Sequence, residues 1–162
     1  MIAVDTNLLV YAHRADSVWH RQARECLEKL AAGGSRWALP WPCLYEFYAV
    51  VTHPKIFPRP TPPPTALEAC QEFASSPQVR LLTETEDFVE KLGRLIGGLD
   101  LKGPKIHDAR IAVLCHVHGV RELWSSDRDF SRFKFLKVAN PLVGGRAEGA
   151  GMRIRWKIKG GY

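Results

Sequence analysis

The chain lacks the features of a disulfide-stapled, zinc-binding or membrane-spanning protein. Its four cysteines, Cys26, Cys43, Cys70 and Cys115, never form a C-x-x-C pair, which argues against a structural zinc site and a redox motif. We expect reduced thiols of the core or of helix faces. No stretch approaches the ~18 consecutive apolar residues of a membrane span. The first residues do not form a secretion signal, so we expect a cytoplasmic protein with no membrane contact.

The composition also lacks the signs of disorder or repetition. Of the 162 residues, 46% are hydrophobic and 25% are charged, which is the balance of an ordinary globular protein. A chain of this length is most economically one domain, and it can bury enough surface to fold without disulfides. We place this domain at residues 1–143 and describe residues 144–162 as a Gly-rich basic C-terminal tail.

Positive charge is concentrated at one end of the chain. The net charge is +6, and residues 128–162 carry nine lysines and arginines against two acids, a net charge of +7. The first 127 residues therefore have a net charge of −1. Such a separation suits a protein that holds a polyanion beside bound cations, although a solubilising tail is the simpler alternative. Near the end, cations alternate strictly with apolar residues and could follow a phosphate backbone: Arg153, Arg155, Lys157 and Lys159.

Hydrophobic patterning predicts an alternation of strands and helices. The expected strands are the short apolar segments at residues 1–4, 37–39, 79–82, 122–125 and 135–138. Helical periodicity marks residues 8–12, 18–30, 42–51, 66–74, 87–96 and 106–117. Six prolines between residues 53 and 64 predict an extended surface loop. Because helices separate the strands, we predict an α/β fold with a parallel sheet covered on both faces.

Four acidic residues stand where apolar segments meet a turn or a helix start. Asp5 and Asp127 follow predicted strands, and Glu46 and Asp108 are expected in the N-terminal turns of predicted helices. Ligands of parallel α/β sheets bind outside the carboxyl ends of the strands, so the fold can gather the four carboxylates at this edge. Like charges in a cleft are costly unless protons or a divalent cation neutralise them. Such oxygen ligands suit Mg²⁺ or Mn²⁺.

A carboxylate site of this kind indicates metal-dependent hydrolysis of a phosphodiester. One ion lowers the pKa of a bound water, and the same or a second ion stabilises the leaving oxygen. Two alternatives stay open. The first is a phosphatase with Asp5 as nucleophile, although Asn7 occupies the position where that chemistry commonly has a second acid. The second is a non-catalytic nucleic-acid or protein-binding module whose acids serve helix dipoles and turns.

Four segments carry a pattern that is specific in combination. They are Asp-Thr-Asn-Leu-Leu-Val-Tyr-Ala from Asp5, the helical segment with Glu46, His-Asp-Ala-Arg-Ile-Ala at 107–112 and Ser-Ser-Asp-Arg-Asp-Phe at 125–130. Together they resemble the PIN-domain nucleases, and most closely the VapC toxins of bacterial toxin–antitoxin pairs. The resemblance implies a PIN-like three-layer α/β/α domain with a parallel five-stranded sheet and endoribonuclease activity. It also implies a Mg²⁺ or Mn²⁺ cofactor, a homodimer and inhibition by a VapB-type antitoxin.

The resemblance also ranks the acidic residues. On matching positions, Asp5 and Asp108 are expected to be the principal metal ligands, and Glu46 and Asp127 complete a catalytic quartet. Asp129 stands two residues after Asp127 and would point to the opposite side of an extended segment. We therefore favour Asp127 as the fourth acid and keep Asp129 as the alternative.

Polar neighbours of the acids are expected to support them. By the same resemblance, Thr6 and Asn7 would orient Asp5 or its waters through hydrogen bonds, and Ser126 would act similarly near Asp127. His107 is kept as a substrate contact only. The basic tail is not part of the family pattern, and three interpretations of it stay open: an RNA contact through its four alternating cations, an antitoxin contact, or a disordered end.

Overall fold

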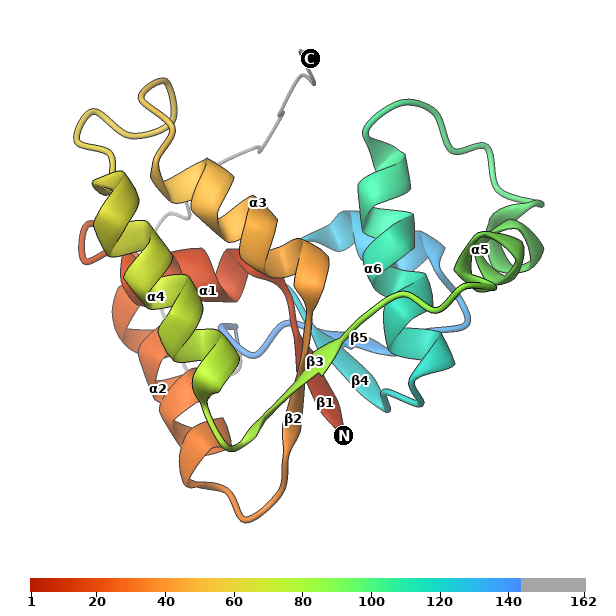
Figure 1. Ribbon diagram of the computed structural model, residues 1–162, viewed down its shortest axis with the longest axis horizontal. Coiled ribbons are helices and arrows are strands. Elements are labelled where there is room, and N and C mark those ends of the chain that lie inside the picture. Colours follow the sequence, from red (N-terminus) through yellow and green to blue (C-terminus); the bar gives the residue numbers. More distant parts are fainter. Residues whose placement is uncertain (144–162) are drawn as a thin grey trace.

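Five parallel strands form the centre of the protein, with helices on both sides (Figure 1). The computed structural model describes residues 1–143. The strands, in the spatial order β3-β2-β1-β4-β5, are β1 Ile2–Val4, β2 Trp37–Pro40, β3 Val79–Leu82, β4 Glu122–Trp124 and β5 Val138–Ala139. The helices are α1 Thr6–His13, α2 His20–Ala32, α3 Trp41–Val51, α4 Pro63–Ser75, α5 Phe88–Ile96, α6 Lys105–Val117 and the 3₁₀ helix η1 Arg128–Arg132. The predicted α/β/α fold with a parallel five-stranded sheet is confirmed.

The helices divide into two groups around the sheet. Figure 1 shows α1, α2 and α4 on the left of the sheet and α5 and α6 on the right, with α3 between the groups. The packing agrees, since α3 contacts α1 and α4 on one side and α6 on the other. Helix α3 therefore lies beside the edge of the sheet where β1 and β4 end.

The central strands are buried on both faces, as expected for a parallel sheet covered by helices. Ala3 and Val4 of β1 and Leu123 of β4 are fully buried. Phe47 of α3 also lies in this core, where it meets the ring of Phe73 edge to face at 5.5 Å. The burial of β1 and β4 fixes the two strands that carry Asp5 and the segment before Asp127.

Two predicted boundaries are wrong for identifiable reasons. The first helix begins at Thr6 instead of residue 8, because the Asp5 side chain accepts the backbone N–H of Thr6 and caps the helix. The fifth strand was predicted at residues 135–138 but comprises Val138–Ala139. The chain still turns before it, as the N–H of Leu136 donates to the carbonyl of Phe133 at 3.0 Å. Apolar residues of that turn fill the core without pairing as a strand.

The Pro-rich segment is not wholly a surface loop. It ends at Pro62, because α4 begins with Pro63, a residue that the first helical turn tolerates. Phe57 is buried, and the guanidinium of Arg14 lies 4.0 Å from the centre of its ring. The same guanidinium donates to the carbonyl of Arg59 at 2.8 Å. Arg14 therefore anchors this loop against the end of α1.

Other predictions concern the cysteines, the membrane and the tail. The four cysteines are free thiols, two of them buried and two half-buried, as predicted. None of the helices in the described part of the chain has the length and apolarity to cross a membrane. The tail at residues 144–162 lies outside the described residues, and with it the predicted RNA contacts Arg153, Arg155, Lys157 and Lys159.

Candidate functional site

The four predicted acids come from separate elements that meet at the carboxyl edge of the sheet. Asp5 directly follows β1, and its N–H donates to the carbonyl of Trp124 at the end of β4 at 3.0 Å. Asp108 lies in the first turn of α6, as predicted. Asp127 is the N-cap of η1, just after β4. Glu46, by contrast, is the sixth residue of α3 and lies in the second turn, so its predicted place in the N-terminal turn is wrong.

The Asp5 carboxylate is buried and held in a fixed orientation. Only 4% of the residue is exposed. Its Oδ1 accepts the N–H of Thr6 at 2.8 Å, and its Oδ2 accepts the side chains of Asn7 and Ser125, each at 2.6 Å. The thiol of Cys43 lies 4.0 Å from Oδ1. Four donors therefore surround one carboxylate, which prevents it from rotating.

The side chains of Thr6 and Asn7 contact different acids. The Thr6 hydroxyl donates to Glu46 Oε2 at 2.6 Å, so it holds the side chain that reaches in from α3. The amide of Asn7 donates to Asp5 and, at 2.9 Å, to Ser125 Oγ. Its carbonyl oxygen accepts the N–H of Ser126 at 3.2 Å. One short helix start thus connects three segments of the site.

Ser125 is a site residue that the sequence reasoning missed. It is 2% exposed, and its hydroxyl donates to Asp5 while accepting Asn7 and, at 2.9 Å, the N–H of Asp127. The supporting hydroxyl was expected at Ser126, which instead contributes its backbone N–H. In the parallel pairing Val4 lies opposite Trp124, which places Asp5 beside Ser125. Pairing of the first and fourth strands was the signal that could have found it.

Burial and mutual repulsion keep these acids from ionising easily. Burial, then the charge of Glu46, and to a smaller extent that of Asp108, raise the pKa of Asp5 to about 8, against the hydrogen bonds from Ser125 and Thr6. Burial, followed by the charges of Asp127, Glu46 and Asp129, raises the pKa of Asp108 to about 7. Burial also raises the pKa of Glu46, although the Thr6 hydroxyl and the nearby His107 oppose that shift. The site therefore has an excess of negative charge.

Asp127 and Asp129 do not lie in an extended segment, so the expectation that they point to opposite sides does not hold. Asp127 Oδ1 accepts the N–H of Asp129 at 2.8 Å and caps η1. Asp129 forms an ion pair with Arg132 at 3.1 Å. The charge of Asp127 bears on both Glu46 and Asp108, whereas that of Asp129 bears on Asp108. Asp127 is therefore the more central of the two.

The four carboxylates suit a hard divalent cation, but they are not arranged as a complete coordination shell. Carboxylate oxygens are the ligands that Mg²⁺ and Mn²⁺ prefer, and the raised pKa values of Asp5 and Asp108 mark a place where a cation would relieve repulsion. Within residues 1–143, no three His, Cys, Asp or Glu side chains are grouped closely enough to hold one ion. Rotation of the less restrained acids, such as Asp108, would have to bring the carboxylates together around it.

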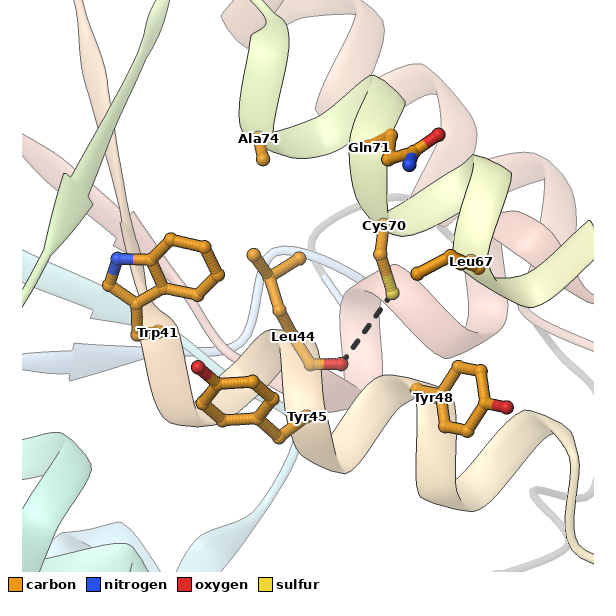
Figure 2. Close-up of a pocket in the computed structure, with 8 residues that line it drawn as sticks. All are labelled: Trp41, Leu44, Tyr45, Tyr48, Leu67, Cys70, Gln71 and Ala74. Carbon is orange, nitrogen blue, oxygen red and sulfur yellow. Dashed lines mark hydrogen bonds between the residues drawn. The ribbon is translucent and has the colours of Figure 1, made fainter. Parts of the chain in front are cut away.

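A separate apolar groove lies between α3 and α4 (Figure 2). Its volume is about 240 Å³, and it is lined by Trp41, Leu44, Tyr45, Tyr48, Leu67, Cys70, Gln71 and Ala74. The rings of Trp41 and Tyr45 stack at 5.8 Å along α3, and the Cys70 thiol donates to the carbonyl of Leu44 at 3.7 Å. None of the four acids lines this groove, so it is not part of the acidic site.

Comparison with known proteins identifies the family. The model of the PIN domain matches residues 2–136. The chain belongs to the PIN-domain family. Ribonuclease VapC48 of Mycobacterium tuberculosis is 32% identical to it over 140 residues, which are 86% of this chain and 97% of the relative. The VapC ribonuclease Mb2897 of Mycobacterium bovis is 36% identical over 144 residues, 89% of this chain and 97% of the relative. These relatives place this PIN-domain protein among the VapC ribonucleases, as the resemblance predicted.

Solved structures share the fold of this PIN-domain protein at lower identity. A crystal structure of VapBC2 from Rickettsia felis bound to a DNA fragment from their promoter matches with a TM-score of 0.64, 20% identity and coverage of 86% of this chain and 98% of that one. The crystal structure of Mycobacterium tuberculosis VapC20, described as a sarcin-ricin loop cleaving toxin, also matches with a TM-score of 0.64 and 20% identity. The match covers 85% of this chain and 98% of that one. Both confirm the PIN-type architecture.

Proposed function

We propose that this PIN-domain protein is a Mg²⁺- or Mn²⁺-dependent endoribonuclease toxin that acts in the cytoplasm. The observation that carries this proposal is the set of acids around Asp5, drawn from β1, α3, α6 and the start of η1, with raised pKa values at its three more buried members. Its ribonuclease relatives support the substrate class.

The chain's own residues have distinct tasks in this proposal. Asp5, Asp108, Glu46 and Asp127 would hold the cation, which when bound supplies an activated water and stabilises charge on the leaving oxygen. Asn7 and Ser125 hold Oδ2 of Asp5, the Thr6 N–H holds its Oδ1, and the Thr6 hydroxyl fixes Glu46. No hydrogen bond within the described residues fixes the Asp108 carboxylate, which leaves it free to turn toward an ion. Asp129 remains the alternative fourth acid.

A homodimer and a VapB-type antitoxin complete the proposal. The solved VapBC2 complex from Rickettsia felis supports an antitoxin partner for a chain of this fold. One chain has a mass of 18.2 kDa, and light scattering on the purified full chain should give twice that value. Added VapB-type antitoxin should raise that mass and stop RNA cleavage, whereas an unchanged mass and rate would refute this part.

Cleavage assays on purified full chain test the proposed reaction. We expect cleavage of single-stranded and structured RNAs with Mg²⁺ or Mn²⁺, and loss of it with EDTA. Asp5→Asn and Asp108→Asn should each lose it while remaining folded. The matched control is Asp100→Asn, because Asp100 is an exposed acid that pairs with Lys102 and is not one of the four site acids. Cleavage that survives both site variants refutes the metal mechanism, and RNA binding without cleavage favours the non-catalytic binding module.

A further inference from the structure

An arginine is held in place at the rim of the acidic site. Arg132 is the last residue of η1, which packs against α6, the helix of Asp108. Its Nε donates to the backbone carbonyl of Asp129 at 2.8 Å, and its Nη2 lies 3.1 Å from Asp129 Oδ1. Its side chain remains 25% exposed. The guanidinium is close enough to Asp108 that its charge lowers the pKa of that acid.

The orientation of Arg132 leaves donors available. A guanidinium has five N–H groups in a planar fork, and Asp129 takes two of them. Within residues 1–143 the other N–H groups have no hydrogen-bonded acceptor. A fork of this shape matches the oxygens of a phosphate, and because Asp129 restricts its motion, less entropy is lost when a ligand binds.

Other cations are engaged, lie elsewhere or are not held in place. Arg128 and Lys105 also lie on η1 and α6, but within residues 1–143 no ion pair or hydrogen bond holds either side chain in place as Asp129 holds Arg132. Arg110, in the second turn of α6, is paired with Glu84. Lys137 pairs with Glu122 at 2.6 Å at the amino end of β4, which is the opposite edge of the sheet. Arg121 precedes β4 at that same edge. Arg132 thus places a fixed positive charge beside acids that would otherwise repel the phosphates of RNA.

We propose that Arg132 is a substrate-contacting residue whose free N–H groups bind a phosphate of the RNA next to the bond that is cut. Asp129 positions the guanidinium for this contact. The inference rests on the proposed ribonuclease function and adds a phosphate subsite on η1.

The test measures binding without cleavage. Full-length Asp5→Asn protein in Mg²⁺ is titrated into a fluorescent single-stranded RNA of mixed sequence at several salt concentrations. Adding Arg132→Gln should weaken binding about tenfold and reduce the slope of log affinity against log salt by about 0.7, the loss of one phosphate contact. Adding Arg132→Lys should restore the slope but only part of the affinity. Arg121→Gln, which removes the same charge at the opposite edge, should leave both values near those of the parent.

A variant of Asp129 separates a substrate contact from a structural clamp. In Asp129→Asn the backbone bond to Arg132 Nε persists and one repelling charge is lost, so RNA should bind at least as tightly as to the parent. If Arg132 served only to anchor Asp129, Asp129→Asn and Arg132→Gln would weaken binding equally, and that result overturns the inference. An unchanged salt slope in Arg132→Gln also overturns it. If Arg132→Gln does not fold, the Arg132→Lys and Asp129→Asn results decide.

Failure of the inference and failure of the proposed function give different results. If the function is wrong, the unmodified chain does not cut RNA with Mg²⁺ or Mn²⁺. If only the inference is wrong, the unmodified chain cuts RNA, but Arg132→Gln binds it with the affinity and salt slope of the Asp5→Asn parent.

Discussion

Asp108→Asn should stabilise the metal-free protein at the same time as it abolishes activity. Burial and the neighbouring acids raise the pKa of Asp108 from 3.8 to about 7. A difference of about three pKa units corresponds to about 4 kcal/mol of unfolding free energy, and solvent screening at this partly exposed side chain reduces the expected gain to about 1–3 kcal/mol. Asparagine has nearly the same shape and no charge, and within residues 1–143 the change breaks no hydrogen bond of the Asp108 carboxylate.

The effect should depend on pH in a defined direction. Because the folded-state pKa is raised, the wild-type protein has the full stability contribution of Asp108 only below the unfolded pKa, and it loses this contribution as pH rises through about 7. The variant has nothing to ionise at this position. The two proteins should therefore be equally stable near about pH 4 and differ most above about pH 7.

Urea unfolding in EDTA at pH values on both sides of this range measures the difference. Asp100→Asn, at an exposed acid, is the control and should change stability by less than about 0.5 kcal/mol. Mg²⁺ at about 100 times its dissociation constant should add about 2.7 kcal/mol to the wild-type protein and less to Asp108→Asn. If Asp108→Asn is no more stable than wild type above neutral pH without metal, Asp108 does not lie in the repulsive cluster described above.

Three further substitutions test other parts of the structure. Ser125→Ala leaves a buried carboxylate and two further groups short of a partner, so urea unfolding should show a loss of about 1–3 kcal/mol together with slower cleavage, whereas Ser126→Ala should be nearly neutral. Thr6→Val releases Glu46, so half-maximal cleavage should require more Mn²⁺, and an unchanged metal titration would contradict the contact. Arg14→Ala should lower stability by about 1–2 kcal/mol through the Pro-rich loop yet leave the cleavage rate of the folded protein unchanged.

The alternation of strands and helices could be predicted because each element carries its own apolar period. Its ends could not always be predicted, because they depend on contacts between distant residues. The Pro-rich loop shows this most clearly. Proline spacing predicts an extended surface segment, but the burial of Phe57 depends on Arg14, which lies more than forty positions earlier at the end of α1. No local pattern contains that contact.

The location of the acids could be predicted for a different reason, because it follows from the fold class and does not depend on side-chain detail. A carboxylate after a buried parallel strand must emerge at the carboxyl edge, and this holds for Asp5 wherever β1 lies in the sheet. The prediction for Glu46 holds despite an error in its position along the helix, because its long side chain reaches the Thr6 hydroxyl from the second turn of α3. The location of such acids can thus be predicted even where their exact helical turn is misjudged.

Ser125 needed information that the fold class does not contain. The choice between Ser125 and Ser126 depends on which residue of β4 lies opposite β1, and a shift of one residue would turn the other hydroxyl inward. The observed register pairs Val4 with Trp124, so the residue after each strand meets its counterpart, and Asp5 accepts the Ser125 hydroxyl at 2.6 Å. The sequence indicates that a serine supports the acids here, whereas only the pairing of two strands more than a hundred residues apart determines which serine it is.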